Sequence, residues 1–385
     1  MNFFGQSKFP ATTQRRASAW CKLTLTPGAS GPYPPGARWL KRRAVRGGCA
    51  KRRRDRPQKG NRVALYDIFN GDADGICALH QLRLAQPRDS VLVTGVKRDI
   101  ALVARVSAAP GDELTVLDVS LAENRVAVLN ALEAGARCLY FDHHFPGDIP
   151  DHPGLEAHIA YRPGICTSLI VDDYLGARFR AWAVVAAFGD NLPAQAERAA
   201  EPLSLSAAQL TLLRELGECM NYNAYGDTVQ DLHFHPAELY RRLQPFADPS
   251  EFAARDPAFE TLREGYREDL AQAVRVRPVL AGLSHYLLIL PDTRWARRVH
   301  GAVANRLAGA HPRRAHAVLV KRDSSYRASV RAPKARPVGA DELCRRFPTG
   351  GGRPEAAGIE ALPATQIGQF RQAFESAFES PPTGP

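Results

Sequence analysis

The sequence lacks the features that mark membrane and secreted proteins. No apolar run in its 385 residues approaches the ~20 residues that a membrane span needs. The beginning of the chain has no basic segment followed by an apolar stretch and a cleavage pattern, as a secretory signal would have. The seven cysteines are scattered, and no two form a Cys-x-x-Cys pair. These absences favour a protein of the reducing cytoplasm without a membrane partner over a disulfide framework or a zinc knuckle.

Acidic residues are almost missing from the first 60 residues. This segment holds 15 lysines and arginines and one acid, Asp55, whereas the rest of the chain holds 36 basic and 39 acidic residues. The net charge of +11 therefore belongs to residues 1–60 and does not predict a general affinity for nucleic acid. Because this segment is rich in Pro, Gly, Ser and Arg and has no periodicity, we expect a disordered basic extension. A phosphate-binding arm is the alternative.

From Val63 onward, apolar runs alternate with segments of helical pattern. Four runs predict strands, over residues 63–69, 91–96, 113–119 and 137–140. Helices are predicted between and after them, over 76–85, 122–134, 167–175 and 180–188. Strands that alternate with helices indicate βαβ units and a mostly parallel sheet.

The second half of the sequence predicts a helical region and then a smaller α+β domain. Residues 195–275 mix charged residues with Leu and Ala and are expected to be mainly helical. A β-rich pattern follows, with strands expected over 285–290, 315–320 and 326–331, a helix over 295–307, a glycine turn at 350–352 and a closing helix over 364–378. We therefore predict an α/β fold with a parallel-sheet domain, a helical connector and an α+β domain, over 61–195, 196–277 and 278–380.

Carboxylates and imidazoles follow the ends of several predicted strands. Asp72 and Asp74 lie in the turn after the first strand, Asp118 ends the third, and Asp142-His143-His144 end the fourth. Asp190 follows a predicted helix. In an open α/β sheet, ligands bind beyond the carboxyl ends of the strands, so we expect these side chains to converge there.

So many acids in one place would have raised pKa values unless a cation compensates their charge. Oxygen and imidazole ligands without a thiolate suit manganese or magnesium, with cobalt or zinc as alternatives. Two divalent ions ~3.5–4 Å apart would activate a water for in-line attack at phosphorus. The opposing interpretation is that these acids are caps, turn residues or surface charges.

Four segments resemble, in order and spacing, the motifs of the DHH phosphoesterase superfamily. They are Asn-Gly-Asp-Ala-Asp-Gly at 70–75, Leu-Asp-Val-Ser at 117–120, Asp-His-His at 142–144 and Gly-Asp-Asn at 189–191. The glycine-rich segment 350–358 is similar to a turn in that superfamily's first associated domain. The resemblance covers about 63–378 and implies the superfamily's fold.

The resemblance implies roles for the matching residues. Asp72 and Asp74 would each bind one of two divalent ions, with manganese the expected metal and magnesium or cobalt the alternatives. Asp118 would bridge the two ions. His143 and Asp190 would complete the second site.

The resemblance also implies the groups that act on the substrate. His144 would face the scissile phosphate. Asp142 would orient a histidine without binding a metal itself, as metal-bound imidazoles usually require. The far end of the substrate would be held by residues of the last domain: Arg331, Gly350, Gly351, Gly352 and Arg353. Glycine N–H groups in a turn form an anion-binding nest, and arginine suits bidentate contact with phosphate.

Three positions depart from the superfamily pattern. Ile68 stands where many members carry His, so one metal site would have fewer protein ligands. Asn70 stands where exonuclease-like members often have Asp, and Arg353 where nano-RNA phosphatases commonly have His. The chain therefore matches no single branch completely.

These inferences predict a hydrolase, a manganese-dependent phosphoesterase or exonuclease, that acts on short oligonucleotides or nucleotide phosphates. The nearly neutral charge after residue 60 favours short substrates over long single strands. A homodimer is compatible with the sequence. A catalytically degraded nucleotide- or nucleic-acid-binding protein on the same fold and a pyrophosphatase are the alternatives. Residues 221–227 predict either a turn between helices or part of the substrate site.

Overall fold

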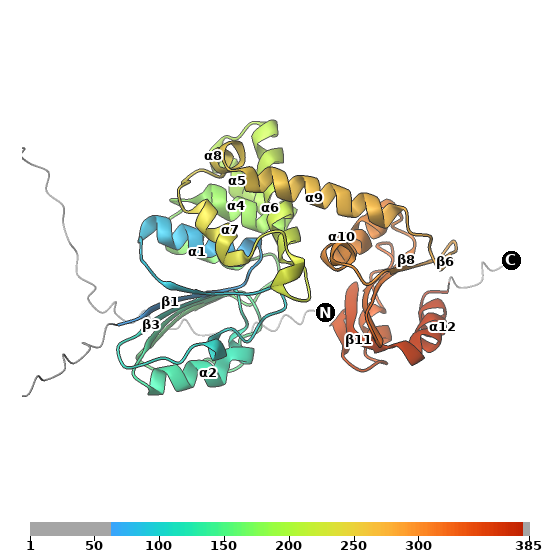
Figure 1. Ribbon diagram of the computed structural model, residues 1–385, viewed down its shortest axis with the longest axis horizontal. Helices are drawn as coiled ribbons and strands as arrows, with labels where there is room; N and C mark the ends of the chain where they lie inside the picture. The colour runs from blue at the N-terminus through green and yellow to red at the C-terminus, as the bar shows by residue number, and fades with distance from the viewer. Residues whose placement is uncertain (1–62, 380–385) are drawn as a thin grey trace, which may run out of the picture. The chain divides into compact units, whose positions relative to one another are not determined.

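The computed structural model describes residues 63–379, so the predicted extension over residues 1–60 lies outside the described part. Two β-sheets, each with its own helices, make up this part of the chain (Figure 1). None of the helices in this range combines the length and the apolar character that crossing a membrane requires.

The first sheet has five parallel strands in the order β2-β1-β3-β4-β5. They are β1 (Leu65–Phe69), β2 (Val91–Val93), β3 (Glu113–Leu117), β4 (Arg137–Asp142) and β5 (Leu155–Ile159). Helix α1 (Ala73–Ala85) covers one face and α2 (Leu121–Glu133) the other (Figure 1). Parallel sheets are covered on both faces, which is why the central strands are nearly continuous apolar runs. The sequence predicted β1 to β4 and missed β5, a half-buried edge strand with a polar Glu and His.

A group of helices follows the first sheet, as the sequence predicted. Its members are α3 (Thr167–Tyr174), α4 (Arg180–Gly189), α5 (Pro193–Ala200), α6 (Ala207–Ala224), α7 (Pro236–Leu243), α8 (Pro249–Arg255) and α9 (Pro257–Val274). Helix α4 is buried from Trp182 to Gly189 and packs against α1 and α6. This helix therefore lies in the core of the first domain, and its end reaches the carboxyl edge of the sheet.

The second sheet has six strands in the order β10-β11-β9-β8-β7-β6. They are β6 (Leu280–Ala281), β7 (His285–Leu290), β8 (Ala315–Lys321), β9 (Ser325–Arg331), β10 (Gly350–Arg353) and β11 (Ala356–Pro363). Helices α10 (Arg294–Ala310), α11 (Ala340–Cys344) and α12 (Ile367–Ala377) accompany it. Strands β7 and β8 pair in parallel and the other pairs are antiparallel. The predicted fold class is confirmed, whereas the boundaries of the domains stay a prediction.

The predicted glycine turn at 350–352 is wrong, because these residues begin strand β10, which pairs antiparallel with β11. Gly352 has a φ of 139°, and a Cβ atom on it would lie 2.5 Å from the Cα of Ala357. A glycine within a strand often marks such a close approach of two backbones. Gly352 therefore permits close pairing of β10 with β11, whereas a Cβ atom on Gly351 would meet nothing within 4 Å.

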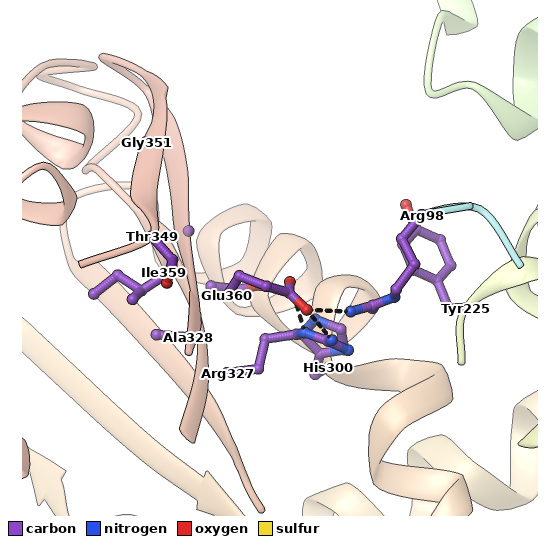
Figure 2. A pocket seen from close by; sticks show the side chains of 11 residues that line it. Arg98, Tyr225, His300, Arg327, Ala328, Thr349, Gly351, Ile359 and Glu360 are labelled. Atoms are coloured by element: carbon purple, nitrogen blue, oxygen red, sulfur yellow. Dashed lines mark hydrogen bonds and ion pairs between the residues drawn. The ribbon is translucent and has the colours of Figure 1, made fainter. Parts of the chain in front are cut away.

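Contacts between the two parts of the fold involve charged side chains. Arg98, in the loop after β2, donates from Nη1 to Oε1 of Glu360 on β11 over 2.7 Å (Figure 2). Arg327 on β9 is paired with Asp227, which follows α6. The second sheet is therefore held against loops at the carboxyl edge of the first.

Candidate metal centre

Asp72 caps the N-terminus of α1. Its Oδ1 accepts hydrogen bonds from the backbone N–H groups of Asp74 at 3.0 Å and Gly75 at 3.1 Å. Aspartate is favoured at this position because it satisfies N–H groups that have no partner within the helix and because its charge suits the helix dipole. The strand-turn-helix pattern in the sequence therefore fixes this carboxylate at the end of β1.

Asp74 is held by the first residues of α3. Its two carboxylate oxygens accept from the backbone N–H groups of Thr167 and Ser168, each at 2.7 Å. The N–H groups at a helix N-terminus bind anions readily. Sequence reasoning missed Thr167 and Ser168, although the pair at the start of a predicted helix was the available signal.

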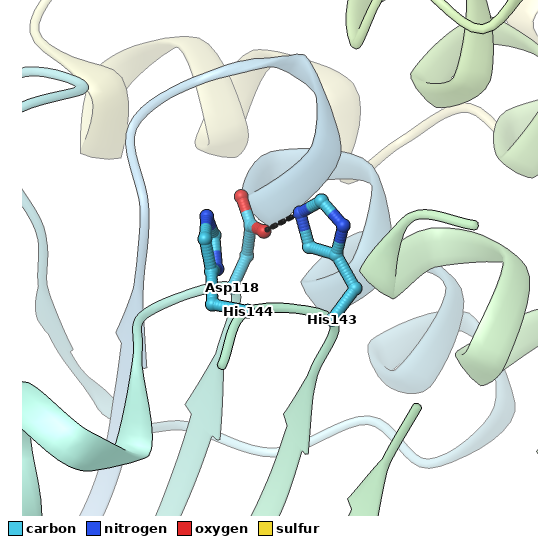
Figure 3. Close-up of side chains that lie close together, drawn as sticks. All are labelled: Asp118, His143 and His144. Atoms are coloured by element: carbon cyan, nitrogen blue, oxygen red, sulfur yellow. Dashed lines mark ion pairs between the residues drawn. The ribbon is translucent and has the colours of Figure 1, made fainter. Parts of the chain in front are cut away.

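Asp118 follows β3 in a left-handed backbone conformation, with a φ of 59°. Such a conformation costs a residue other than glycine roughly 1–3 kcal/mol, and it tends to occur at functional positions. A hydrogen bond from its N–H to the carbonyl of Phe141, 3.0 Å long, holds the turn. Its Oδ1 accepts from Oγ1 of Thr167 at 3.0 Å and lies 3.5 Å from Nε2 of His143 (Figure 3).

The Asp-His-His segment presents its two imidazoles on either side of Asp118 (Figure 3). Nδ1 of His144 lies 2.8 Å from Oδ1 of Asp142, which is fully buried. Burial opposes a charge on His144, but the hydrogen bond and the charge of Asp142 outweigh it and raise the pKa of this histidine. The geometry suits the orienting role predicted for Asp142, which stays a prediction.

Carboxylates crowd this site. Burial and the nearby charges of Asp74, Asp72 and Asp190 raise the pKa of Asp118 well above its usual range. A cation would remove this penalty, because opposite charge favours the ionised carboxylate.

Two overlapping sets of side chains bring their ligand atoms within 4.8 Å of one another. One set is Asp118, His143 and His144, and the other is Asp74, His143 and Asp190. Imidazole and carboxylate groups without a thiolate fit a divalent ion of the manganese or magnesium type. Of the predicted ligands, Asp74, Asp118, His143 and Asp190 therefore come together, whereas Asp72 belongs to neither set.

Lys97, which sequence reasoning missed, contacts Asp72. Its Nζ lies 2.5 Å from Oδ2 of Asp72 and 3.6 Å from Oδ1 of Asp190. Burial alone would raise the pKa of Asp72, but the charge and hydrogen bond of Lys97 outweigh it and lower that pKa to about 2. Lys97 follows β2, which lies beside β1 in the sheet, so the strand order explains the contact.

A cavity of 390 Å³ lies between the loop after β2 and the second sheet, and none of the candidate metal ligands lines it (Figure 2). Residues from both parts of the fold line it, among them Arg98, Tyr225, His300, Arg327, Gly351 and Glu360. Nζ of Lys97 lies 5.7 Å from the centre of the Tyr225 ring, so one lining residue of the cavity contacts the lysine of the acidic cluster.

The predicted substrate residues are only partly at this cavity. Gly351 lines it, and Gly350 and Gly352 flank that residue in β10. Arg331 donates from Nε to Oδ1 of Asn305 at 2.7 Å, and the side chain of Arg353 is 81% exposed. Their roles toward a substrate stay predictions.

The segment 221–227 divides into structural and site-facing residues. Tyr222 is buried and bonds through its hydroxyl to Asp269, and Asn223 holds the backbone of residues 233–234. Asn221 reaches Nζ of Lys97 at 3.2 Å, and Tyr225 lines the cavity. Because Asn221 to Ala224 continue helix α6, the predicted turn is confined to the last residues.

No family model matches the chain, and no curated protein matches it. Solved structures show that the chain has the fold of the DHH phosphoesterase superfamily. A RecJ exonuclease bound to manganese is 17% identical, with a TM-score of 0.54 over 83% of this chain and 91% of that chain. The DHH domain of a protein assigned to a ribosomal protein family is 13% identical, with a TM-score of 0.55 over 82% and 86%. The pGpG-specific phosphodiesterase PggH from Vibrio cholerae is 14% identical, with a TM-score of 0.50 over 82% and 98%.

Proposed function

We propose that the chain is a divalent-metal-dependent phosphoesterase that hydrolyses short oligonucleotides or nucleotide phosphates. One observation carries the proposal: Asp74, His143 and Asp190, from three separate segments, bring their ligand atoms within 4.8 Å of one another. Manganese is the metal we expect, with magnesium or cobalt as alternatives. A bound divalent ion would withdraw charge from a phosphoryl oxygen and make water a better nucleophile.

His144 is the group that we assign to the substrate phosphate. Its Nδ1 is 2.8 Å from Asp142, which fixes the proton on that nitrogen and leaves Nε2 for a phosphoryl oxygen. An imidazolium in this position donates a hydrogen bond to the negative charge that develops during phosphoryl transfer. Asp142 acts through His144, because its carboxylate is fully buried and cannot reach solvent.

The cavity between the loop after β2 and the second sheet is where we place the nucleotide. Tyr225 offers an aromatic face, and Arg98 and Arg327 offer charge-assisted donors for a second phosphate. Asp227 and Glu360 already neutralise part of this charge. This balance favours a short or singly extended substrate over a long single strand, which needs a continuous basic track. Gly351, Arg331 and Arg353 are assigned to the far end of the same substrate.

The test is a substrate panel with manganese or magnesium, with the products separated by chromatography. The panel contains a linear dinucleotide, a cyclic dinucleotide, a 3′,5′-bisphosphonucleotide, short RNA, short DNA and pyrophosphate. We expect turnover of at least one nucleotide substrate and its loss when a chelator removes the metal.

Asp118→Asn should lower turnover of that substrate by about 100-fold or more, because it removes a carboxylate that faces His143 and belongs to a candidate set of metal ligands. Asp89→Asn changes an exposed aspartate outside the site and should leave the rate unchanged. Equal rates for the wild type and Asp118→Asn would contradict the proposal.

A nucleotide-binding protein with a degraded catalytic site is the second candidate. The contact between Lys97 and Asp72 favours it, because it occupies a carboxylate predicted to bind metal. This candidate predicts that a nucleotide from the same panel binds with measurable affinity while no product forms under any metal. Product formation by the wild type excludes it.

A further inference from the structure

The ammonium group of Lys97 lies inside the acidic cluster and is surrounded by oxygen atoms. Its Nζ is 2.5 Å from Oδ2 of Asp72, 3.2 Å from Oδ1 of Asn221 and 3.6 Å from Oδ1 of Asp190. A lysine ammonium has three donors and no acceptor, and two of them are used in hydrogen bonds to Asp72 and Asn221, while Asp190 lies at ion-pair distance. The Lys97 side chain is 30% exposed, and that of Asp72 only 3%.

The loop that carries Lys97 is fixed from both sides. The backbone N–H of Lys97 donates to the carbonyl of Ala224 at 3.0 Å, and its carbonyl accepts from Nδ2 of Asn70 at 3.1 Å. A carboxylate at position 70 could not donate this second bond, so the amide of Asn70 is what the loop requires. A Cβ atom on Gly71 would lie 2.0 Å from the carbonyl oxygen of Gly95, so glycine permits the two loops to meet.

Asp72 differs from Asp74 because its free oxygen, Oδ2, is already paired with a cation of the protein. Its Oδ1 caps α1 through the N–H groups of Asp74 and Gly75, and its Oδ2 bonds to Lys97. Within residues 63–379, neither set of potential metal ligands includes it. Ile68, at the position where many superfamily members carry a histidine ligand, cannot replace it because it is apolar and fully buried in a cluster with Val116.

Asp190 connects the two halves of this arrangement. It approaches the Lys97 ammonium on one side and belongs to the ligand set with Asp74 and His143 on the other. A carboxylate in this position faces two cations at once. One is part of the protein, and the other would be the bound ion.

We propose that this centre holds a single divalent ion and that the Lys97 ammonium occupies the position of a second one. Asp74, His143 and Asp190 hold the ion, while Asp72 serves the ammonium and the helix. The sequence alone predicted two ions, because it showed the carboxylates but not the lysine among them. The inference rests on the metal-binding part of the proposed function and not on the identity of the substrate.

The test counts bound ions. Full-length wild type, Lys97→Met and Lys97→Arg are dialysed against manganese, the bound metal is measured, and electron paramagnetic resonance reports whether two ions are coupled. We expect one ion per chain without coupling in the wild type and in Lys97→Arg. Lys97→Met should gain a second ion with a coupled signal, because Asp72 is released.

Melting curves test whether each variant is folded. Lys97→Met leaves the carboxylate of Asp72 without its cation, so we expect manganese to raise its melting temperature more than that of the wild type. Lys321→Met removes an exposed lysine and should match the wild type in ion count and in melting. If Lys97→Met does not fold even with manganese, Lys97→Gln is used in its place.

Two ions with a coupled signal in the wild type would overturn the inference, and so would a single ion in Lys97→Met. A chain that binds one ion and hydrolyses no substrate would overturn the proposed function alone. A chain that hydrolyses nucleotides while binding two coupled ions would overturn this inference alone.

Discussion

His80, on α1, is kept neutral by its surroundings. Its Nε2 lies 2.8 Å from the carbonyl oxygen of Phe246, and its ring meets Trp182 edge-on at 4.7 Å. Nδ1 is buried and has no hydrogen-bond partner among the described residues. Burial lowers the pKa of His80 to about 4, because a second proton would create a charge that no group compensates.

This buried histidine should make stability fall in acid. Its pKa in the folded chain is about 4, below the ordinary 6.5, so the unfolded chain binds a proton at a higher pH than the folded chain does. What neutral His80 contributes to the free energy of unfolding is therefore full above pH 6.5 and is lost as the pH falls toward 4. Gln at position 80 does not titrate and can still donate to Phe246. We expect His80→Gln to reduce the acid-induced loss of unfolding free energy by up to ~3 kcal/mol.

The measurement is urea unfolding at pH 7.5 and pH 4.5. His311→Gln changes an exposed histidine and serves as the matched control, with the same acid-induced loss as the wild type. An identical loss in His80→Gln and the wild type would show that His80 does not carry this effect.

Two glycines set the distance between the helices that deliver the acidic residues. A Cβ atom on Gly217 of α6 would lie 2.1 Å from the carbonyl oxygen of Val185 in α4. A Cβ atom on Gly189, the last residue of α4, would lie 2.5 Å from Cβ of Ala73, the first residue of α1. Because Asp190 follows Gly189 directly, this close packing places Asp190 beside the turn that carries Asp74.

Gly217→Ala should therefore affect both stability and metal binding. The added methyl group forces α4 and α6 apart, which costs about 1–3 kcal/mol of unfolding free energy. Asp190 moves with α4, so the affinity for manganese should fall as well. Denaturant unfolding and manganese titration measure the two effects.

Gly301→Ala is the control, because nothing lies within 4 Å of the new Cβ atom on α10. In an open helical position, alanine should stabilise the chain by about 0.5–1 kcal/mol. If the two substitutions had the same effect, the close crossing of α4 and α6 would not be the determinant.

The sequence predicted the strands whose residues form an apolar run, because such a run is visible in a short stretch of sequence. Strands β1, β3 and β4 are apolar runs that end in polar residues, and the rule for parallel sheets then placed Asp118 and His143 at one edge. Strands β10 and β11 were missed, because the glycines that form β10 indicate a turn as readily as a strand. The contact between Lys97 and Asp72 was not predicted, because it depends on β2 lying next to β1. One sequence does not reveal the order of the strands in a sheet.

The metal centre as a whole depends on the complete fold. Its groups come from the turn after β1, the loop after β2, the ends of β3 and β4, and the end of α4. Parts of the chain more than 100 residues apart must be in place before the ligand atoms can meet. An ion that binds the folded chain alone stabilises it, by about 2.7 kcal/mol at a concentration 100 times its Kd.

Calorimetric titration of manganese into the wild type and His143→Gln tests this account most directly. His143 belongs to both sets of potential ligands, and no other side chain of the described residues does. We predict that the wild type binds manganese and that His143→Gln binds it about 100-fold more weakly, while His311→Gln keeps the wild-type affinity. Equal affinity in the wild type and His143→Gln, or no binding to either, would contradict the claim that these side chains form a metal centre.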